Sequence, residues 1–166
     1  SEPYIPEENK LEFFNRHGMD ISSPLLVLLP GSRQQEIDRH WNIFLDTVDI
    51  IIKKKPELQV CVAKASNVKI DPLPKYIRVE KKLTKCAILH SDVALASSGT
   101  ATLECAVHDT PFVVCYKMST LSWILVNLLA KVPYSSMVNL IAEKKVVPEF
   151  LQSKMRPSPI AESLLK

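Results

Sequence analysis

Glycine is scarce in this sequence, with three residues among 166, namely Gly18, Gly31 and Gly99. Glycine loses more conformational freedom on folding than any other residue, so it is expected where the backbone needs a positive φ or a close approach. Proline is plentiful by comparison, with twelve residues. Each glycine therefore marks a position at which sterics, and not chain flexibility, decide the residue.

A large excess of charge of either sign is also missing. The chain has 21 Lys and Arg against 18 Asp and Glu, a net charge of +3. This is far below the dense basic stripe that a nucleic-acid binder needs to displace counterions, so nucleic acid is not the expected partner. The charged fraction of 23% and the hydrophobic fraction of 46% are close to globular averages, which argues against a disordered chain or a coiled coil.

The cysteines form no C-x-x-C pair, and they lie far apart in the sequence. Most of them sit inside apolar runs, which predicts buried free thiols of a reducing cytosol and not a disulfide framework or a zinc site. The four cysteines are Cys61, Cys86, Cys105 and Cys115.

The histidines show no metal-ligand spacing such as H-E-x-x-H, so no metal site is expected from them. Each is predicted to lie at the end of a helix. The four are His17, His40, His90 and His108.

No apolar run found here is long enough to cross a bilayer. The strongly apolar stretch 121–130 is about half of the roughly 20 residues that a transmembrane helix needs. It predicts a buried helix, with a helix that touches a membrane surface as the alternative. The basic residues gathered in 53–85 predict a solvated face, and the alternative is a surface that binds anionic lipid.

Strand-like and helix-like segments alternate along the chain. Leu25–Leu29 is an unbroken apolar run between two prolines, typical of a strand buried on both faces of a parallel sheet. Beyond Gly31, apolar residues recur at helical spacing over 37–52, and Ser32 with Gln35 predicts a capping box at the start of that helix. The alternation predicts an α/β fold with a parallel sheet and right-handed crossovers. Further strands are expected at 58–63, 76–79, 92–96 and 111–116, and further helices at 83–89 and 101–107.

The expected organisation is a lead-in segment over 1–20 followed by one Rossmann-like domain over 21–166. Within the lead-in, a short helix over 8–17 is predicted, with Leu11, Phe13 and Phe14 as its apolar positions and Gly18 as its end. The first residues lack the basic and apolar regions of a signal peptide. The absence of an initiator Met leads us to expect a part of a longer chain.

Gly31 and Gly99 occupy equivalent places, the turn between the end of a buried strand and the start of a helix. Open α/β sheets bind ligands there, because free backbone N–H groups and the positive end of the helix dipole favour an anion. The sequence has neither a P-loop nor a G-x-G-x-x-G fingerprint. Arg33, in the first turn of its helix, can grip phosphate oxygens in a bidentate manner. The alternative is two well-capped helices with no ligand.

Around Gly99, the segment Ser97-Ser98-Gly99-Thr100-Ala101-Thr102 supplies hydroxyls and small residues that leave room for a ligand. Glu104 falls about one turn into the following helix. A carboxylate there can accept two hydrogen bonds from the cis-diol of a ribose. The alternative role of Glu104 is complementarity with the helix dipole.

Four motifs in the sequence together resemble lipid-A-disaccharide synthases. They are Leu-Leu-Pro-Gly-Ser-Arg-Gln-Gln-Glu-Ile (28–37), Ala-Ser-Ser-Gly-Thr-Ala-Thr-Leu-Glu-Cys (96–105), Pro-Phe-Val-Val-Cys-Tyr-Lys (111–117) and Val-Pro-Glu-Phe-Leu-Gln (147–152). The resemblance runs from about Leu11 to Lys166. It implies one half of a GT-B glycosyltransferase, the carboxyl-terminal half that binds a nucleotide sugar. The amino-terminal acceptor domain, expected to carry the catalytic base, is absent, so no catalytic residue is assigned in this half.

The resemblance also implies a role for each matching residue. Arg33 is implied at the pyrophosphate, Glu104 at the ribose and Lys117 beside the diphosphate, with Gln152 near the nucleotide. Asn139 follows Met137 and Val138, where the family usually has Leu-Pro. The full implied substrate-binding set is Gly31, Ser32, Arg33, Ser98, Gly99, Thr100, Thr102, Glu104, Lys117, Asn139 and Gln152.

The implied reaction transfers 2,3-diacylglucosamine from UDP to 2,3-diacylglucosamine 1-phosphate, forming lipid A disaccharide 1-phosphate and UDP. No cofactor or metal is expected, since the sequence has no D-x-D motif and helix termini with cationic side chains can neutralise the leaving diphosphate. Another UDP-sugar enzyme, of the murein glycosyltransferase or UDP-GlcNAc epimerase type, and a non-catalytic nucleotide-binding or assembly module are the alternatives. The implied location is the cytoplasm, with peripheral contact at the inner face of the inner membrane and a homodimer left open.

Overall fold

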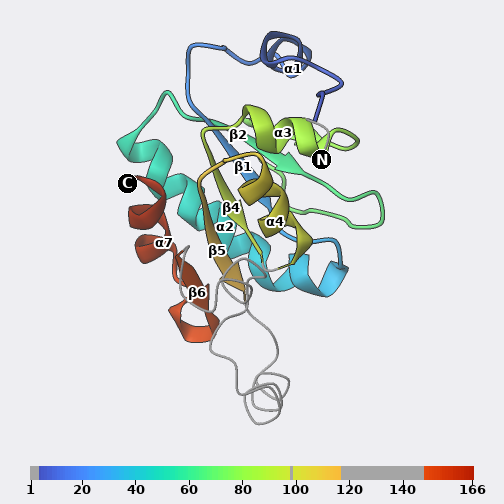
Figure 1. Cartoon of the computed structure of the whole chain (residues 1–166). Coiled ribbons are helices and arrows are strands. Elements are labelled where there is room, and N and C mark those ends of the chain that lie inside the picture. Colours follow the sequence, from blue (N-terminus) through green and yellow to red (C-terminus); the bar gives the residue numbers. More distant parts are fainter. Residues whose placement is uncertain (1–3, 98, 117–147) are drawn as a thin grey trace.

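The computed structural model describes residues 4–97, 99–116 and 148–166. Within them the strands form one parallel sheet in the order β3-β2-β1-β4-β5-β6 (Figure 1). The predicted α/β Rossmann-like sheet is therefore confirmed. The elements are α1 (Lys10–Arg16), β1 (Leu25–Leu29), α2 (Gln34–Lys54), β2 (Gln59–Ala63), β3 (Ile77–Glu80), α3 (Thr84–His90), β4 (Val93–Ala96), α4 (Thr100–Val107), β5 (Phe112–Tyr116), β6 (Glu149–Leu151), the 3-10 helix η1 (Gln152–Lys154) and α7 (Pro157–Leu164).

Two hydrophobic clusters cover the two faces of the sheet. In β1, Leu26 and Leu28 belong to the cluster that includes residues of α2 and α7. Their neighbours in β1 point to the opposite face, into the cluster that includes residues of α1, α3 and α4. All five residues of β1 are buried, because side chains alternate between faces and both faces are covered.

The predicted elements lie within a residue or two of the observed ones from β1 to β5. The sequence did not predict β6, which pairs in parallel with β5, or the terminal helix α7. The helix expected over 121–130 and Trp123 lie outside the described residues. All four cysteines are buried and free, as predicted, and Trp41 is a core residue with 2% exposure.

The lead-in helix α1 belongs to the core and not to a separate unit. Of the three apolar positions predicted for this helix, Phe13 and Phe14 are fully buried in the hydrophobic cluster that includes residues of α3 and α4, whereas Leu11 is 52% exposed. Asn9 and Glu12 form a capping box at the start of α1, and Gly18 ends the turn beyond it at φ +65°.

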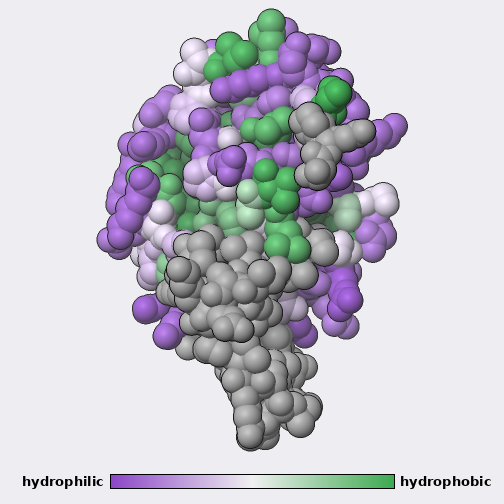
Figure 2. All heavy atoms as spheres, viewed as in Figure 1, coloured by the Kyte–Doolittle hydropathy of each residue, from purple (hydrophilic) through white to green (hydrophobic). Residues whose placement is uncertain are grey.

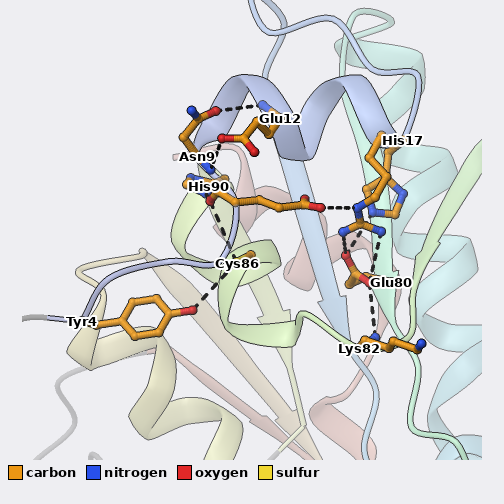
Figure 3. A network of polar contacts seen from close by, with 10 residues as sticks. Tyr4, Asn9, Glu12, His17, Glu80, Lys82, Cys86 and His90 are labelled. Atoms are coloured by element: carbon orange, nitrogen blue, oxygen red, sulfur yellow. Dashed lines mark hydrogen bonds and ion pairs between the residues drawn. The ribbon is translucent and has the colours of Figure 1, made fainter.

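A buried carboxylate fastens α1 to the edge strand β3. Glu80, 2% exposed, pairs with Arg16, and its Oε1 lies 3.2 Å from Nε2 of His17 (Figure 3). The backbone N–H of Lys82 donates to Oε2 of the same carboxylate at 3.2 Å. Arg16 in turn contacts Glu8, whose Oε1 is 2.7 Å from its Nε. The contacts of Glu80 with Arg16 and His17 join residues that are more than 60 positions apart.

The surface is mostly polar, with hydrophobic residues gathered over α4 in the face drawn (Figure 2). Val107, the last residue of α4, is 72% exposed. The basic residues of 53–85 are exposed except for Lys64, which agrees with a solvated face. Among the described residues, no helix is both long enough and apolar enough to span a bilayer.

Candidate functional site

The order of the strands places the carboxyl ends of β1 and β4 side by side. We call the region beyond these ends, at the Gly31 and Gly99 turns, the crevice. These two strands are neighbours, with Leu29 paired to Ala96 at their carboxyl ends. The helix after β1 packs on one face of the sheet and the helix after β4 on the other, as the two clusters show. The chain therefore leaves this point in opposite directions, which is the topological switch point where open α/β sheets bind ligands. The turns that carry Gly31 and Gly99 both open onto it.

Ser97 joins the two turns. Its backbone N–H donates to the carbonyl of Leu29 at 2.9 Å and its hydroxyl donates to the same oxygen at 3.2 Å. The side chain is buried, with 2% exposure of the residue. Ser97 was not among the predicted site residues, although it stands directly before Ser98 in the motif. Its position at the end of a buried strand was the available signal.

The Gly31 turn favours glycine because its φ is +118°, a conformation that L side chains rarely adopt. A Cβ built on Gly31 would also overlap with Oε2 of Glu36, whose flexible side chain would have to move. Helix α2 then begins at Gln34 with Arg33 as its N-cap and no side-chain cap. The capping box predicted from Ser32 and Gln35 was therefore wrong, because Ser32 precedes the N-cap.

The Gly99 turn has more space beside its glycine than the Gly31 turn, as far as the described residues show. Gly99 is the N-cap of α4 at φ +135°, and among the described residues a Cβ built there meets no heavy atom within 4 Å. Thr102, which is buried, donates its hydroxyl to the carbonyl of Gly99 at 2.7 Å. Thr100 begins α4, and Ser98 lies outside the described residues.

Arg33 is the cation at this crevice. It is 84% exposed and its only ion pair described here is a long one, with Nε 3.9 Å from Oε1 of Glu36. The carboxylate of Glu36 is 15% exposed. Burial raises the pKa of Glu36, while the charges of Arg33 and Arg39 lower it. Burial also raises the pKa of Tyr116, at the end of β5, and the charge of Glu36 adds to this.

His40 lies behind the same turn and not at a helix end, so the prediction for this histidine was wrong. It is fully buried within α2, and its Nδ1 lies 3.5 Å from the carbonyl oxygen of Pro30. Its ring packs against Phe44 and Tyr116, with centroid distances of 6.3 and 5.1 Å. The other histidines, His17, His90 and His108, do lie at helix ends.

Glu104 lies on α4 beyond the first turn, 37% exposed at its side chain. Its Oε2 is 3.7 Å from Nε2 of His108, one turn further along, and the ring of Tyr4 covers His108 at 5.0 Å between centroids. The carboxylate is thus drawn toward the end of α4 that is remote from Gly99.

The remaining predicted residues are not all brought to the crevice. Gln152 follows β6, at a φ of +52°, and β6 is separated from β4 by β5. Lys117 and Asn139 lie outside the described residues. No group of three or more His, Cys, Asp or Glu side chains that could hold a metal ion occurs in the described part of the chain.

A parallel Rossmann-like sheet with two glycine turns and an exposed arginine at its switch point defines an α/β domain suited to an anionic, nucleotide-like ligand. A family model described as lipid-A-disaccharide synthetase matches residues 2–166. The chain belongs to this family, which confirms the resemblance inferred from its motifs.

Curated relatives agree with that assignment. The lipid-A-disaccharide synthase of Solibacter usitatus is 39% identical over 167 residues, covering 97% of this chain and 43% of the relative. The enzyme of the same name from Chromobacterium violaceum is 36% identical, with 89% of this chain and 41% of the relative covered. That of Hahella chejuensis is 30% identical, with 95% and 42% covered. The chain spans less than half the length of these relatives.

Proposed function

We propose that this chain is the donor-binding half of a glycosyltransferase that makes lipid A disaccharide. In this proposal the enzyme transfers 2,3-diacylglucosamine from UDP to 2,3-diacylglucosamine 1-phosphate. The observation that carries the proposal is the switch-point crevice, where Gly31 and Gly99 stand at the starts of α2 and α4. Family membership supports the choice of a lipid A glycosyltransferase.

The work of this half is to bind UDP and stabilise it as a leaving group. Developing negative charge on the diphosphate is favoured by the positive ends of helix dipoles and by a cation that is free to approach. Helix α2 has 21 residues, and Arg33 at its start is exposed with a single long ion pair among the described contacts. Lys117 and Asn139 are further proposed ligands, and Gln152 is proposed near the nucleotide.

The catalytic base and the acceptor site are proposed to lie in a second domain that this chain does not include. Relatives more than twice as long as the matched region are consistent with such a domain. Holding donor and acceptor together across a cleft can contribute about 7 to 11 kcal/mol to lowering the barrier. The chain alone is therefore expected to bind UDP without turnover. The proposed location is the cytoplasm, where the lipid acceptor brings the enzyme to the inner face of the inner membrane.

Calorimetric titration of the purified chain with UDP tests the proposal. UDP is expected to bind more tightly than UMP, because the second phosphate reaches the crevice. Arg33→Ala and Arg33→Lys should both weaken UDP binding, since a lysine cannot reproduce a bidentate guanidinium contact. Arg78→Ala, a change at an exposed residue of β3, is the matched control and should bind as the wild type does. Equal affinity for UDP in Arg33→Ala and wild type would contradict the proposal.

A further inference from the structure

The Gly31 turn already holds an anion, and that anion belongs to the protein. Oε2 of Glu36 lies 2.4 Å from the place that a Cβ of residue 31 would take, with Cβ and Cδ of Glu36 at 3.1 and 3.2 Å from the same point. Glu36 is the third residue of α2, so its carboxylate folds back over the start of its own helix. This is the region in which backbone N–H groups and the helix dipole favour negative charge.

The charged and titratable groups that act on Glu36 come from two elements. Arg33 and Arg39 belong to α2 and its N-cap, and their charges stabilise the carboxylate. Tyr116 at the end of β5 is close enough to feel its charge. The Arg33 contact is long, at 3.9 Å, and burial disfavours the charged form of Glu36. Among the described residues, the carboxylate of Glu36 therefore has no close ion-pair partner at the turn.

We propose that Glu36 is a competitor of the ligand's diphosphate for Arg33 and the Gly31 turn, so that nucleotide-sugar binding is weakened by its charge and is coupled to partial proton uptake. The inference rests on the proposed function. A diphosphate at the turn places negative charge beside the carboxylate and favours its neutral form. The proton comes from solvent and is bound by a carboxylate oxygen of Glu36, and Arg33 is then released to the phosphates.

The direction of the pH dependence follows from this coupling. The pKa of Glu36 is raised by burial in the free protein, and a neighbouring diphosphate raises it further, since like charges favour protonation. The complex therefore binds more protons than the free protein between these two pKa values. Affinity should rise as the pH falls through that window and should level off above it.

UDP-N-acetylglucosamine is the probe, because its diphosphate is esterified at both ends and has no proton to lose near neutral pH. Calorimetry in buffers of different ionisation enthalpy gives the number of protons taken up on binding. Wild type should take up a measurable fraction of one proton, with the affinity increasing from pH 8 to pH 5.5. Zero proton uptake by the wild type at every pH between 8 and 5.5 would overturn the inference without any variant being needed.

Glu36→Gln keeps the shape of the side chain and removes the charge. At pH 8 it should bind the probe about fivefold more tightly than wild type, the effect of roughly 1 kcal/mol of repulsion, with no proton uptake. Asp38→Asn is the matched control. Asp38 is an exposed carboxylate of the same helix that accepts a hydrogen bond from Gln34 at 2.9 Å. This variant should have the same affinity for the probe and the same proton uptake as wild type. Weaker or unchanged binding by Glu36→Gln would contradict competition.

The two proposals fail in different ways. If wild type binds the probe no better than Arg33→Ala, the crevice is not the nucleotide site, and both the proposed function and this inference are wrong. If binding depends on Arg33 but is the same in Glu36→Gln and wild type at every pH, the inference alone is wrong.

Discussion

Two glutamates of this domain, the buried Glu80 and the half-buried Glu36, have opposite environments. Glu80 is paired with Arg16 and His17 and accepts backbone N–H groups; burial alone would raise its pKa, but these hydrogen bonds lower it to about 2. Glu36 has Arg33 at 3.9 Å, and its pKa is raised. Glu80 therefore stabilises the fold through its ion pairs, whereas Glu36 lies at the crevice with one long ion pair among the described residues. Incomplete pairing of a buried charge is a feature of functional sites.

Removing Glu80 is expected to cause a clear loss of stability. Glu80→Ala deletes the acceptor of charge-assisted hydrogen bonds, and a hydrogen bond of this kind is worth about 1.5 to 3 kcal/mol. The side chain of Arg16 is 40% exposed, so the loss of stability should lie near the lower end of this range. Glu36→Ala should cost little or nothing, because the raised pKa of Glu36 means that its charge opposes folding at neutral pH. Urea unfolding of both variants at pH 7 measures this, and equal losses would remove the contrast.

Lowering the pH should remove the contribution of Glu80 to stability. Because the folded-state pKa of Glu80 is about 2 against an ordinary 4.5, its contribution to stability is complete above pH 4.5 and is lost as the pH falls toward 2. Wild type should therefore lose more stability than Glu80→Gln over this range. The check is the urea midpoint at several pH values, and parallel curves for the two proteins would show that Glu80 is not the titrating group.

Gly31→Ala should be destabilising by about 1 to 3 kcal/mol, the cost of a residue held at an unfavourable backbone conformation. It should also displace the carboxylate of Glu36, because the new Cβ would overlap with it. Gly99→Ala has a similar conformational cost but meets no described neighbour within 4 Å. If overlap with Glu36 adds to the stability loss of Gly31→Ala, then Glu36→Ala should restore part of that stability. The same second change should leave the stability of Gly99→Ala unaffected. Thermal unfolding of the single and double variants measures this.

Glu104 is a third carboxylate, more exposed than the other two, and its expected effect is on nucleotide selectivity. If it accepts hydrogen bonds from both ribose hydroxyls, wild type should prefer UDP to 2′-deoxy-UDP by roughly tenfold, equivalent to about 1.4 kcal/mol. The preference should shrink toward one in Glu104→Ala. A helix-dipole role instead predicts an unchanged ratio and a lower melting temperature. Dissociation constants of both nucleotides on both proteins decide between them.

Local patterns in the sequence predict the framework of the site well. The run Leu25–Leu29 predicted a strand buried on both faces, and the structure buries all five residues. Gly31 and Gly99 were predicted at strand-to-helix turns, where both have positive φ. By contrast, the short strand β6 carries no such pattern, because Glu149–Leu151 is partly exposed throughout and pairs only at the edge of the sheet.

The sequence by itself determined the alternation of strands and helices, the glycine turns, the buried thiols and the family, because all of these depend on residue type and short-range spacing. Tertiary structure alone decided that β1 and β4 are neighbours, that Ser97 joins the two turns and that the carboxylate of Glu36 covers Gly31. It also paired Glu80 with Arg16, 64 positions away. Strand order and the burial of a charge depend on how distant segments pack, and no local pattern records that packing.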